Sequence, residues 1–149
     1  MTEVNLVIND QKVKAKEGTT ILEAARSIGI DIPTLCQHEK LAPFGACRLC
    51  TVEIIKGKRS RLVTSCVYQV EEGLVVKTES APVVKGRKMI LELLWARAPG
   101  IQEIRDYGKR YGLDINKFGS YPEWTVFIKL GLSDISFSNT IICYPEFGQ

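Results

Sequence analysis

The sequence predicts an α+β fold, in which one helix packs on a face of a small mixed β-sheet and a helical hairpin and short C-terminal tail follow. Three observations support this fold class. Two strand patterns and a capped helix open the chain, three further strand patterns follow a cysteine-rich loop, and the pattern then becomes helical. The expected domains are residues 1–80, residues 81–112 and residues 113–149.

The first two strands are expected to form a hairpin that leads into the helix. Apolar and polar residues alternate over residues 4–17, and Asn9 and Asp10 supply a turn in the middle of this stretch. In the following GTTILEAARSIGI, Thr20 as N-cap and Glu23 three residues later form a capping box. The apolar residues after Thr20 recur at helical spacing, so a short helix begins there.

The later elements follow from similar patterns. Residues 50–55, 61–66 and 73–80 are rich in β-branched residues and read as strands separated by turns. Residues 83–99 and 101–113 show helical patterns on either side of a Pro-Gly break, which indicates a helical hairpin. The hairpin is expected to pack against the first domain, and homodimerisation through it is the alternative.

Composition excludes several classes of function. Of the 149 residues, 45% are hydrophobic and 25% charged, which is typical of a folded domain, and the net charge of +3 is too small to indicate nucleic-acid binding. No apolar run is long enough to span a membrane, and the N-terminus lacks the apolar core of a signal peptide. We therefore expect a cytoplasmic protein, in which clustered cysteines indicate a metal more often than disulfides.

Four of the five cysteines, Cys36, Cys47, Cys50 and Cys66, follow the pattern C-x10-C-x2-C-x15-C, and Cys143 stands apart. Four thiolates suit either zinc or an iron–sulfur cluster, and buried structural cysteines are the alternative without metal. Zinc sites usually pair two short cysteine knuckles, whereas this chain has one. Three cysteines in one loop and a distant fourth are typical of a plant-type [2Fe–2S] site.

The residues between the cysteines agree with such a site. Gly45 and Ala46 are small enough for the backbone to approach bridging sulfides and donate N–H groups to them. Arg48 is expected to face a site made negative by four thiolates. His38 is the only histidine, whereas a Rieske site needs two, so we expect it to structure the loop rather than to bind metal. The residues expected to shield the cluster from water are Pro33, Leu35, Leu41, Pro43 and Phe44.

The segment TILEAARSIGIDIPTLCQHEKLAPFGACRLCTVEI resembles the β-grasp [2Fe–2S] ferredoxin domain. More narrowly, it resembles the version that opens the large iron–sulfur subunit of respiratory NADH dehydrogenase and related subunits of NAD-linked hydrogenases and formate dehydrogenases. The ten residues between the first two cysteines match that version, whereas soluble plant ferredoxins have four. The resemblance covers residues 1–80 and implies one [2Fe–2S] cluster with Cys36, Cys47, Cys50 and Cys66 as ligands.

The chain departs from that family after the first domain. The large NADH dehydrogenase subunit continues with a histidine- and cysteine-containing segment that binds a [4Fe–4S] cluster, and this chain lacks those ligands. Phe127, Leu130, Ser133 and Phe137 have the spacing of a [4Fe–4S] motif without any of its cysteines. We interpret this tail as a degenerate cluster motif, with coincidence as the alternative, and expect Cys143 not to be a ligand.

The expected function is one-electron transfer. No dinucleotide fingerprint or P-loop is present, so we expect no turnover from this chain alone. Its partners would be the flavin-, molybdenum- or iron–sulfur-containing subunits of an NAD(P)H-, formate- or hydrogen-linked oxidoreductase. The alternatives are a zinc-stabilised or metal-free β-grasp interaction module and, less favoured, the small electron-transfer subunit of a molybdenum hydroxylase.

Overall fold

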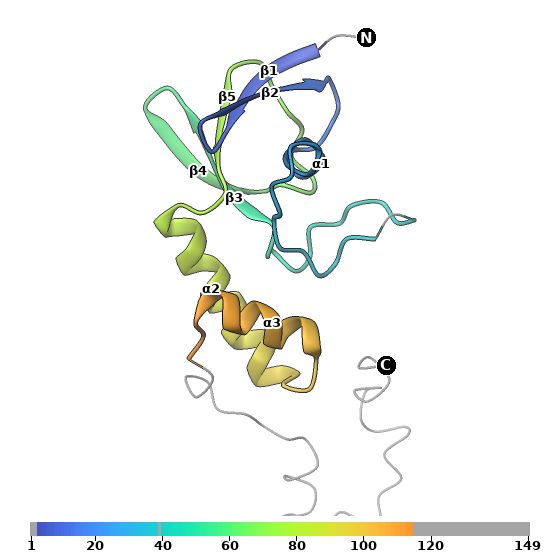
Figure 1. Cartoon of the computed structure of the whole chain (residues 1–149), viewed down its shortest axis with the longest axis vertical. Helices are drawn as coiled ribbons and strands as arrows, with labels where there is room; N and C mark the ends of the chain where they lie inside the picture. The colour runs from blue at the N-terminus through green and yellow to red at the C-terminus, as the bar shows by residue number, and fades with distance from the viewer. Residues whose placement is uncertain (1–2, 39, 115–149) are drawn as a thin grey trace, which may run out of the picture. The chain divides into compact units, whose positions relative to one another are not determined.

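The computed structural model describes residues 3–38 and 40–114, which contain five strands and three helices (Figure 1). The elements, in chain order, are β1 (Glu3–Ile8), β2 (Gln11–Lys16), α1 (Ile21–Ser27), β3 (Thr51–Lys56), β4 (Arg59–Thr64), β5 (Leu74–Lys77), α2 (Ala81–Arg97) and α3 (Gln102–Tyr111). The chain divides into two compact units, Met1–Ile90 and Leu91–Gln149. The predicted boundaries at residues 80 and 112 remain a prediction, and the degenerate motif and Cys143 lie outside the described residues.

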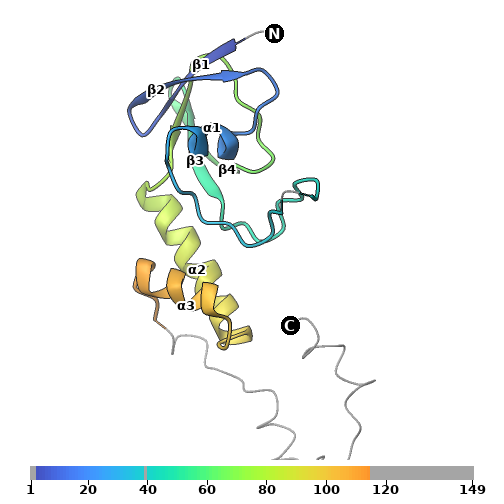
Figure 2. The same cartoon turned by 45° about the vertical axis from the view of Figure 1, so that its right-hand side comes forward.

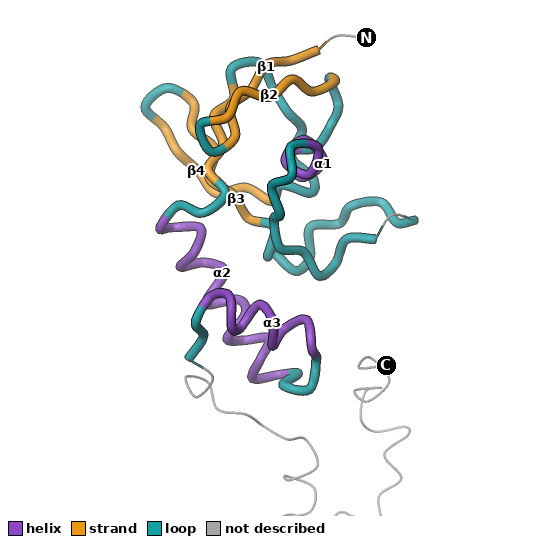
Figure 3. Tube along the Cα trace, viewed as in Figure 1, coloured by secondary structure: helices purple, strands orange, loops and turns teal. Residues whose placement is uncertain are grey.

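The five strands form one mixed sheet in the order β2-β1-β5-β3-β4. Strands β1 and β5 pair in parallel, and the other neighbours pair antiparallel. Helix α1 lies over one face of this sheet, as Figures 2 and 3 show from two directions. The predicted α+β arrangement, a helix on a small mixed sheet, is therefore confirmed.

Local sequence explains the first hairpin and the helix that follows it. Asn9 and Asp10 both have positive φ, 47° and 67°, as a two-residue type I′ turn between β1 and β2 requires. The N-cap Thr20 accepts a hydrogen bond from Glu23 N at 3.2 Å, and Thr20 N donates to Glu23 Oε2 at 2.8 Å. The predicted turn and capping box are both confirmed.

The core lies between the sheet and α1. Leu6 and Ile8 of β1 are buried with Ile21 and Leu22 of α1. Inward-facing residues of the other strands complete this core: Val13, Val52, Ile54, Leu74 and Val76. Two cysteines, Cys50 and Cys66, belong to the same buried cluster, so the cysteine site is attached to the edge of the core.

Helices α2 and α3 are separated by the predicted Pro99-Gly100 break. At the end of α3, Gly112 has a left-handed φ of 58°, and its N–H caps the helix carbonyls. A Cβ at Gly108 would lie 3.4 Å from the ring of Trp95, so the two helices approach closely at that glycine. Within the described residues, no helix combines the length and the hydropathy needed to cross a membrane.

Candidate metal centre

The β3–β4 hairpin brings the second pair of cysteines together. Thr51 of β3 pairs with Thr64 of β4, so the residues just outside the hairpin are held opposite one another. Cys50 directly precedes β3, Cys66 follows β4, and their Sγ atoms lie 3.3 Å apart. Both side chains are buried, with exposed fractions of 1% and 2%.

The first pair comes from the long loop between α1 and β3, which runs outward from the helix in Figures 1 and 2. Cys36 and Cys47 are half-buried, and Cys47 N donates a hydrogen bond to Cys36 Sγ at 3.4 Å. None of the four cysteines in the described residues forms a disulfide. The cysteines therefore lie in two pairs: Cys50 and Cys66 meet through their buried sulfurs, and half-buried Cys36 and Cys47 meet through a backbone N–H and a sulfur.

Backbone geometry supports the approach of the loop to the site. Gly45 has a φ of +69°, and a Cβ at this position would lie 3.1 Å from Val67 Cγ2. Both the conformation and the space therefore favour glycine. Arg48 also has a positive φ of 60°, and its side chain is exposed, as is that of Ala46. The predicted roles of Ala46 and Arg48 beside the cluster remain predictions.

Ser65 binds the backbone of one cysteine from beside another. It is fully buried between β4 and Cys66, and its N and Oγ donate to Cys50 O at 3.1 and 2.8 Å. Its own carbonyl accepts from Leu22 N of α1 at 3.0 Å. Ser65 therefore joins both buried cysteines to the helix. Sequence reasoning missed it, because a lone serine beside a cysteine carries no distinguishing signal.

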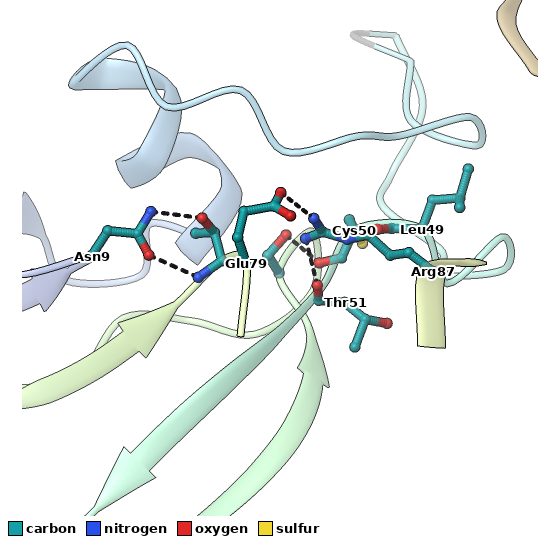
Figure 4. A network of polar contacts seen from close by, with 8 residues as sticks. Asn9, Leu49, Cys50, Thr51, Glu79 and Arg87 are labelled. Atoms are coloured by element: carbon teal, nitrogen blue, oxygen red, sulfur yellow. Dashed lines mark hydrogen bonds and ion pairs between the residues drawn. The ribbon is translucent and has the colours of Figure 1, made fainter. Parts of the chain in front are cut away.

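Arg87 of α2 is a second residue beside the site that the sequence pattern did not single out. Its side chain is fully buried, and its guanidinium donates to Leu49 O, Thr51 O and Glu79 Oε1 (Figure 4). The sequence offered only a weak signal, the apolar residues Val83 and Leu91 four positions before and after Arg87, and the structure shows that all three are buried. A charged residue at such a buried position indicates a buried polar contact.

The pKa values of two thiols are shifted in opposite directions. Burial, and then the hydrogen bond with Cys50, raise the pKa of Cys66 to about 12. At Cys47, burial acts to raise the pKa, but hydrogen bonds with the backbone of Leu35, Leu49 and Cys36 together outweigh it and lower the pKa. Those backbone contacts favour the thiolate, which is the form that binds metal.

Two apolar residues of the α1–β3 loop do not shield the cysteines from water as expected. Leu41 and Phe44 have exposed fractions of 68% and 84%, so these two side chains do not cover the cysteines in this structure, and that expectation is wrong. They lie in a loop stretch without helix or strand, where no neighbouring element packs on them. His38 Nδ1 accepts a hydrogen bond from Lys40 N at 3.2 Å, a local contact that fits its expected loop role.

The donor set fits a binuclear cluster better than a single ion. A [2Fe–2S] cluster takes four cysteine ligands, two for each iron, and the structure brings the four cysteines together as two contacting pairs. A mononuclear zinc site needs its four ligands around one point. In the part of the chain that the structure describes, no group of three or more His, Cys, Asp or Glu side chains is arranged to hold one metal ion.

Comparison with known proteins agrees with this geometry. A family model described as "2Fe-2S iron-sulfur cluster binding domain" matches residues 1–81. The mitochondrial NADH-ubiquinone oxidoreductase 78 kDa subunit of Neurospora crassa is 37% identical over 125 residues, covering 78% of this chain and 16% of that protein. A subunit of the NADH-quinone oxidoreductase of Rickettsia bellii is 33% identical over 124 residues, covering 77% and 18%. The chain thus spans less than a fifth of these relatives.

A solved structure is similar to this chain in fold. A chain of the NAD⁺-reducing [NiFe]-hydrogenase in its H2-reduced state matches with a TM-score of 0.68 and 28% identity, over 79% of this chain and 53% of that one. The predicted β-grasp ferredoxin fold and its [2Fe–2S] cofactor are therefore confirmed. The chain belongs to the 2Fe-2S iron–sulfur cluster binding domain family and is homologous to electron-transfer subunits of NADH dehydrogenase and NAD-reducing hydrogenase.

Proposed function

We propose that this chain is an electron-transfer module of a larger NAD-linked oxidoreductase, with Cys36, Cys47, Cys50 and Cys66 as the four ligands of one [2Fe–2S] cluster. The observation that carries the proposal is the buried contact between the Cys50 and Cys66 sulfurs, together with the hydrogen bond from Cys47 N to Cys36 Sγ. When bound, the cluster supplies reversible one-electron chemistry. The protein supplies its position, its surroundings and a surface for partners.

Each part of the chain has a distinct role in this proposal. The β3–β4 hairpin holds Cys50 and Cys66 in the core, where their sulfurs are protected from water. The α1–β3 loop carries Cys36 and Cys47, which are half-buried and so lie nearer to solvent. A partner can therefore approach the cluster most closely from the loop side, and electron transfer through protein depends on a short path.

The relatives suggest the kind of partner. They are named as subunits of NADH-ubiquinone and NADH-quinone oxidoreductases, and the structural neighbour as an NAD⁺-reducing [NiFe]-hydrogenase. We infer that this chain also works beside a flavin-, molybdenum- or iron–sulfur-containing subunit, without turnover of its own. No observation favours the homodimer. A reducing, cytoplasmic location suits four thiols that must stay free for iron.

The ligand assignment is tested on the whole chain, purified without oxygen or reconstituted with iron and sulfide. We expect about two irons and two sulfides per chain, a red-brown colour and an EPR signal after dithionite reduction. Cys47→Ser removes one thiolate of the half-buried pair, so we expect the EPR signal to be lost or changed in its g-values. Cys143→Ser is the matched control and should leave the spectrum as it is.

Three results would contradict the proposal. A colourless protein that binds one zinc per chain would support the interaction module instead. An unchanged spectrum in Cys47→Ser would remove that residue from the ligand set. An iron content well above about two per chain would contradict the single cluster.

A further inference from the structure

The side chain of Arg87 donates hydrogen bonds to three residues of the first compact unit, Leu49, Thr51 and Glu79 (Figure 4). Its Nε donates to Leu49 O at 3.0 Å, and its Nη2 donates to Thr51 O at 2.7 Å. Its Nη1 binds Glu79 Oε1 at 2.6 Å in an ion pair. The guanidinium therefore bridges two backbone carbonyls, while the carboxylate balances its charge.

These two carbonyls lie on either side of Cys50. The carbonyl of Cys50 itself accepts from Ser65 N and Oγ at 3.1 and 2.8 Å. Three successive carbonyls, at positions 49, 50 and 51, are thus held by donors from two different parts of the chain. The short segment that carries a proposed ligand is therefore fixed at each of its carbonyls.

The arginine also fixes the amide group beside the cysteine. Because a peptide bond is planar and trans, holding the carbonyl of Leu49 holds the direction of the Cys50 N–H as well. Arginine suits this task because its planar fork offers several donors in a rigid arrangement. Lysine keeps the charge but is a point donor on a flexible stem, and cannot hold two carbonyls in the same geometry.

We propose that Arg87 is a positioning residue for the iron–sulfur centre: it holds the backbone on both sides of Cys50, keeps the Cys50–Cys66 pair in place and thereby sets the reduction potential. This inference rests on the ligand assignment proposed above. It gives helix α2, which lies outside the predicted first domain of residues 1–80, a direct role at the cluster.

The expected direction of the effect follows from charge. Reduction adds one electron, so groups that stabilise negative charge favour the reduced state. Fixed amide dipoles around the sulfurs and a buried cation both act in this sense, and hydrogen bonds to the sulfurs are a known influence on potential. Loosening the backbone at Cys50 or removing the guanidinium therefore lowers the potential.

The test uses three variants of the whole, cluster-loaded chain. Arg87→Gln removes the charge and the fork, and Arg87→Lys removes the fork alone. Lys85→Gln is the matched control, because it makes the same charge change on the same helix at an exposed position. The midpoint potential is measured by EPR during a mediated dithionite titration, and amide hydrogen exchange is followed over residues 47–51.

In Arg87→Gln we expect the equilibrium constant for reduction to fall about threefold to tenfold, equal to about 30 to 59 mV for one electron. Arg87→Lys should recover only part of this shift, and both variants should exchange faster over residues 47–51 than Lys85→Gln. If Arg87→Gln fails to fold, Arg87→Lys decides alone: a lowered potential with faster exchange supports the proposal.

Two outcomes overturn it. If Arg87→Lys had the wild-type midpoint potential and the wild-type hydrogen exchange rate over residues 47–51, the positive charge alone would act at this position. Wild-type potential and exchange in both variants would mean that the arginine supports the fold only. A wild-type chain without any cluster signal would instead contradict the proposed function, so the two failures are distinguishable.

Discussion

At the scale of single residues, Gly45 shows how the cysteine loop depends on backbone conformation. Its φ of +69° lies in the left-handed region, which costs a residue with a Cβ about 1 to 2 kcal/mol. A Cβ would also lie 3.1 Å from Val67 Cγ2, so the neighbour would have to move. Gly57 shares the conformation, with a φ of +60°, but has nothing within 4 Å of the same position.

The two glycines make a matched pair of variants. Gly57→Ala should lose about 1 kcal/mol of stability through backbone strain alone. Gly45→Ala should lose about 1 kcal/mol more stability than Gly57→Ala, because its added methyl group also overpacks against Val67 beside Cys47. The measurement is thermal unfolding by far-UV circular dichroism together with the rate at which the visible absorbance bleaches. Equal losses in the two variants would show that the space around Gly45 is not limiting.

At the scale of elements, the β3–β4 hairpin is the part of the fold that builds the buried half of the site. Its register places Cys50 and Cys66 just beyond the paired residues Thr51 and Thr64. Ser65 then closes the hairpin end by donating twice to the carbonyl of Cys50. The cysteines are therefore positioned by the sheet itself and not only by the loop.

Removing the Ser65 hydroxyl should weaken this closure. Ser65→Ala leaves the backbone bond to Cys50 O but loses the buried Oγ bond, so we expect a loss of about 1 kcal/mol in unfolding free energy. Ser27→Ala, which removes from an exposed residue a hydroxyl that donates to Ala24 O, should cost less than about 0.5 kcal/mol. Denaturant unfolding of the cluster-loaded chain measures both. A cost for Ser65→Ala no larger than for Ser27→Ala would contradict the closure.

At the scale of the whole molecule, a cluster is expected to stabilise the cysteine loop more than the β1–β2 hairpin. The β1–β2 hairpin and α1 contribute Leu6, Ile8, Ile21 and Leu22 to the buried core, which does not consist of cysteine-loop residues alone. Residues 28–38 and 40–50 contain no helix or strand, although they carry three of the four proposed ligands. The ends of the loop are buried at Ile32, Leu49 and Cys50, but residues 40–44 are exposed, so a cluster would add contacts that this part of the loop lacks.

Removing iron with a chelator tests this division. A group that binds only the folded state stabilises it, so we expect the melting temperature to fall. Hydrogen exchange should accelerate over residues 31–50 and 64–68, while β1 and β2 keep their protection, since β1 pairs with β2 and β5 and not with the cysteine loop. Equal acceleration in the β1–β2 hairpin would show that the whole first unit folds around the cluster.

Most of the local structure could be predicted because its causes are local. The positive φ angles of Asn9 and Asp10 and the reciprocal bonds of Thr20 and Glu23 involve residues at most three apart. The cysteine spacing likewise pointed to the correct cofactor. The exposure of Leu41 and Phe44 was mispredicted, because burial depends on which elements pack nearby, and spacing carries no information about that.

By itself, the sequence determined the strands, the capped helix and the number and spacing of thiols, all of which follow from backbone preferences and side-chain chemistry at short range. Only the tertiary structure decided how the sulfurs pair and what holds them. Arg87 reaches carbonyls 36 and 38 residues away, and Ser65 binds one 15 residues away. Such contacts arise only when the sheet and α2 bring distant segments together, since no short-range pattern specifies them.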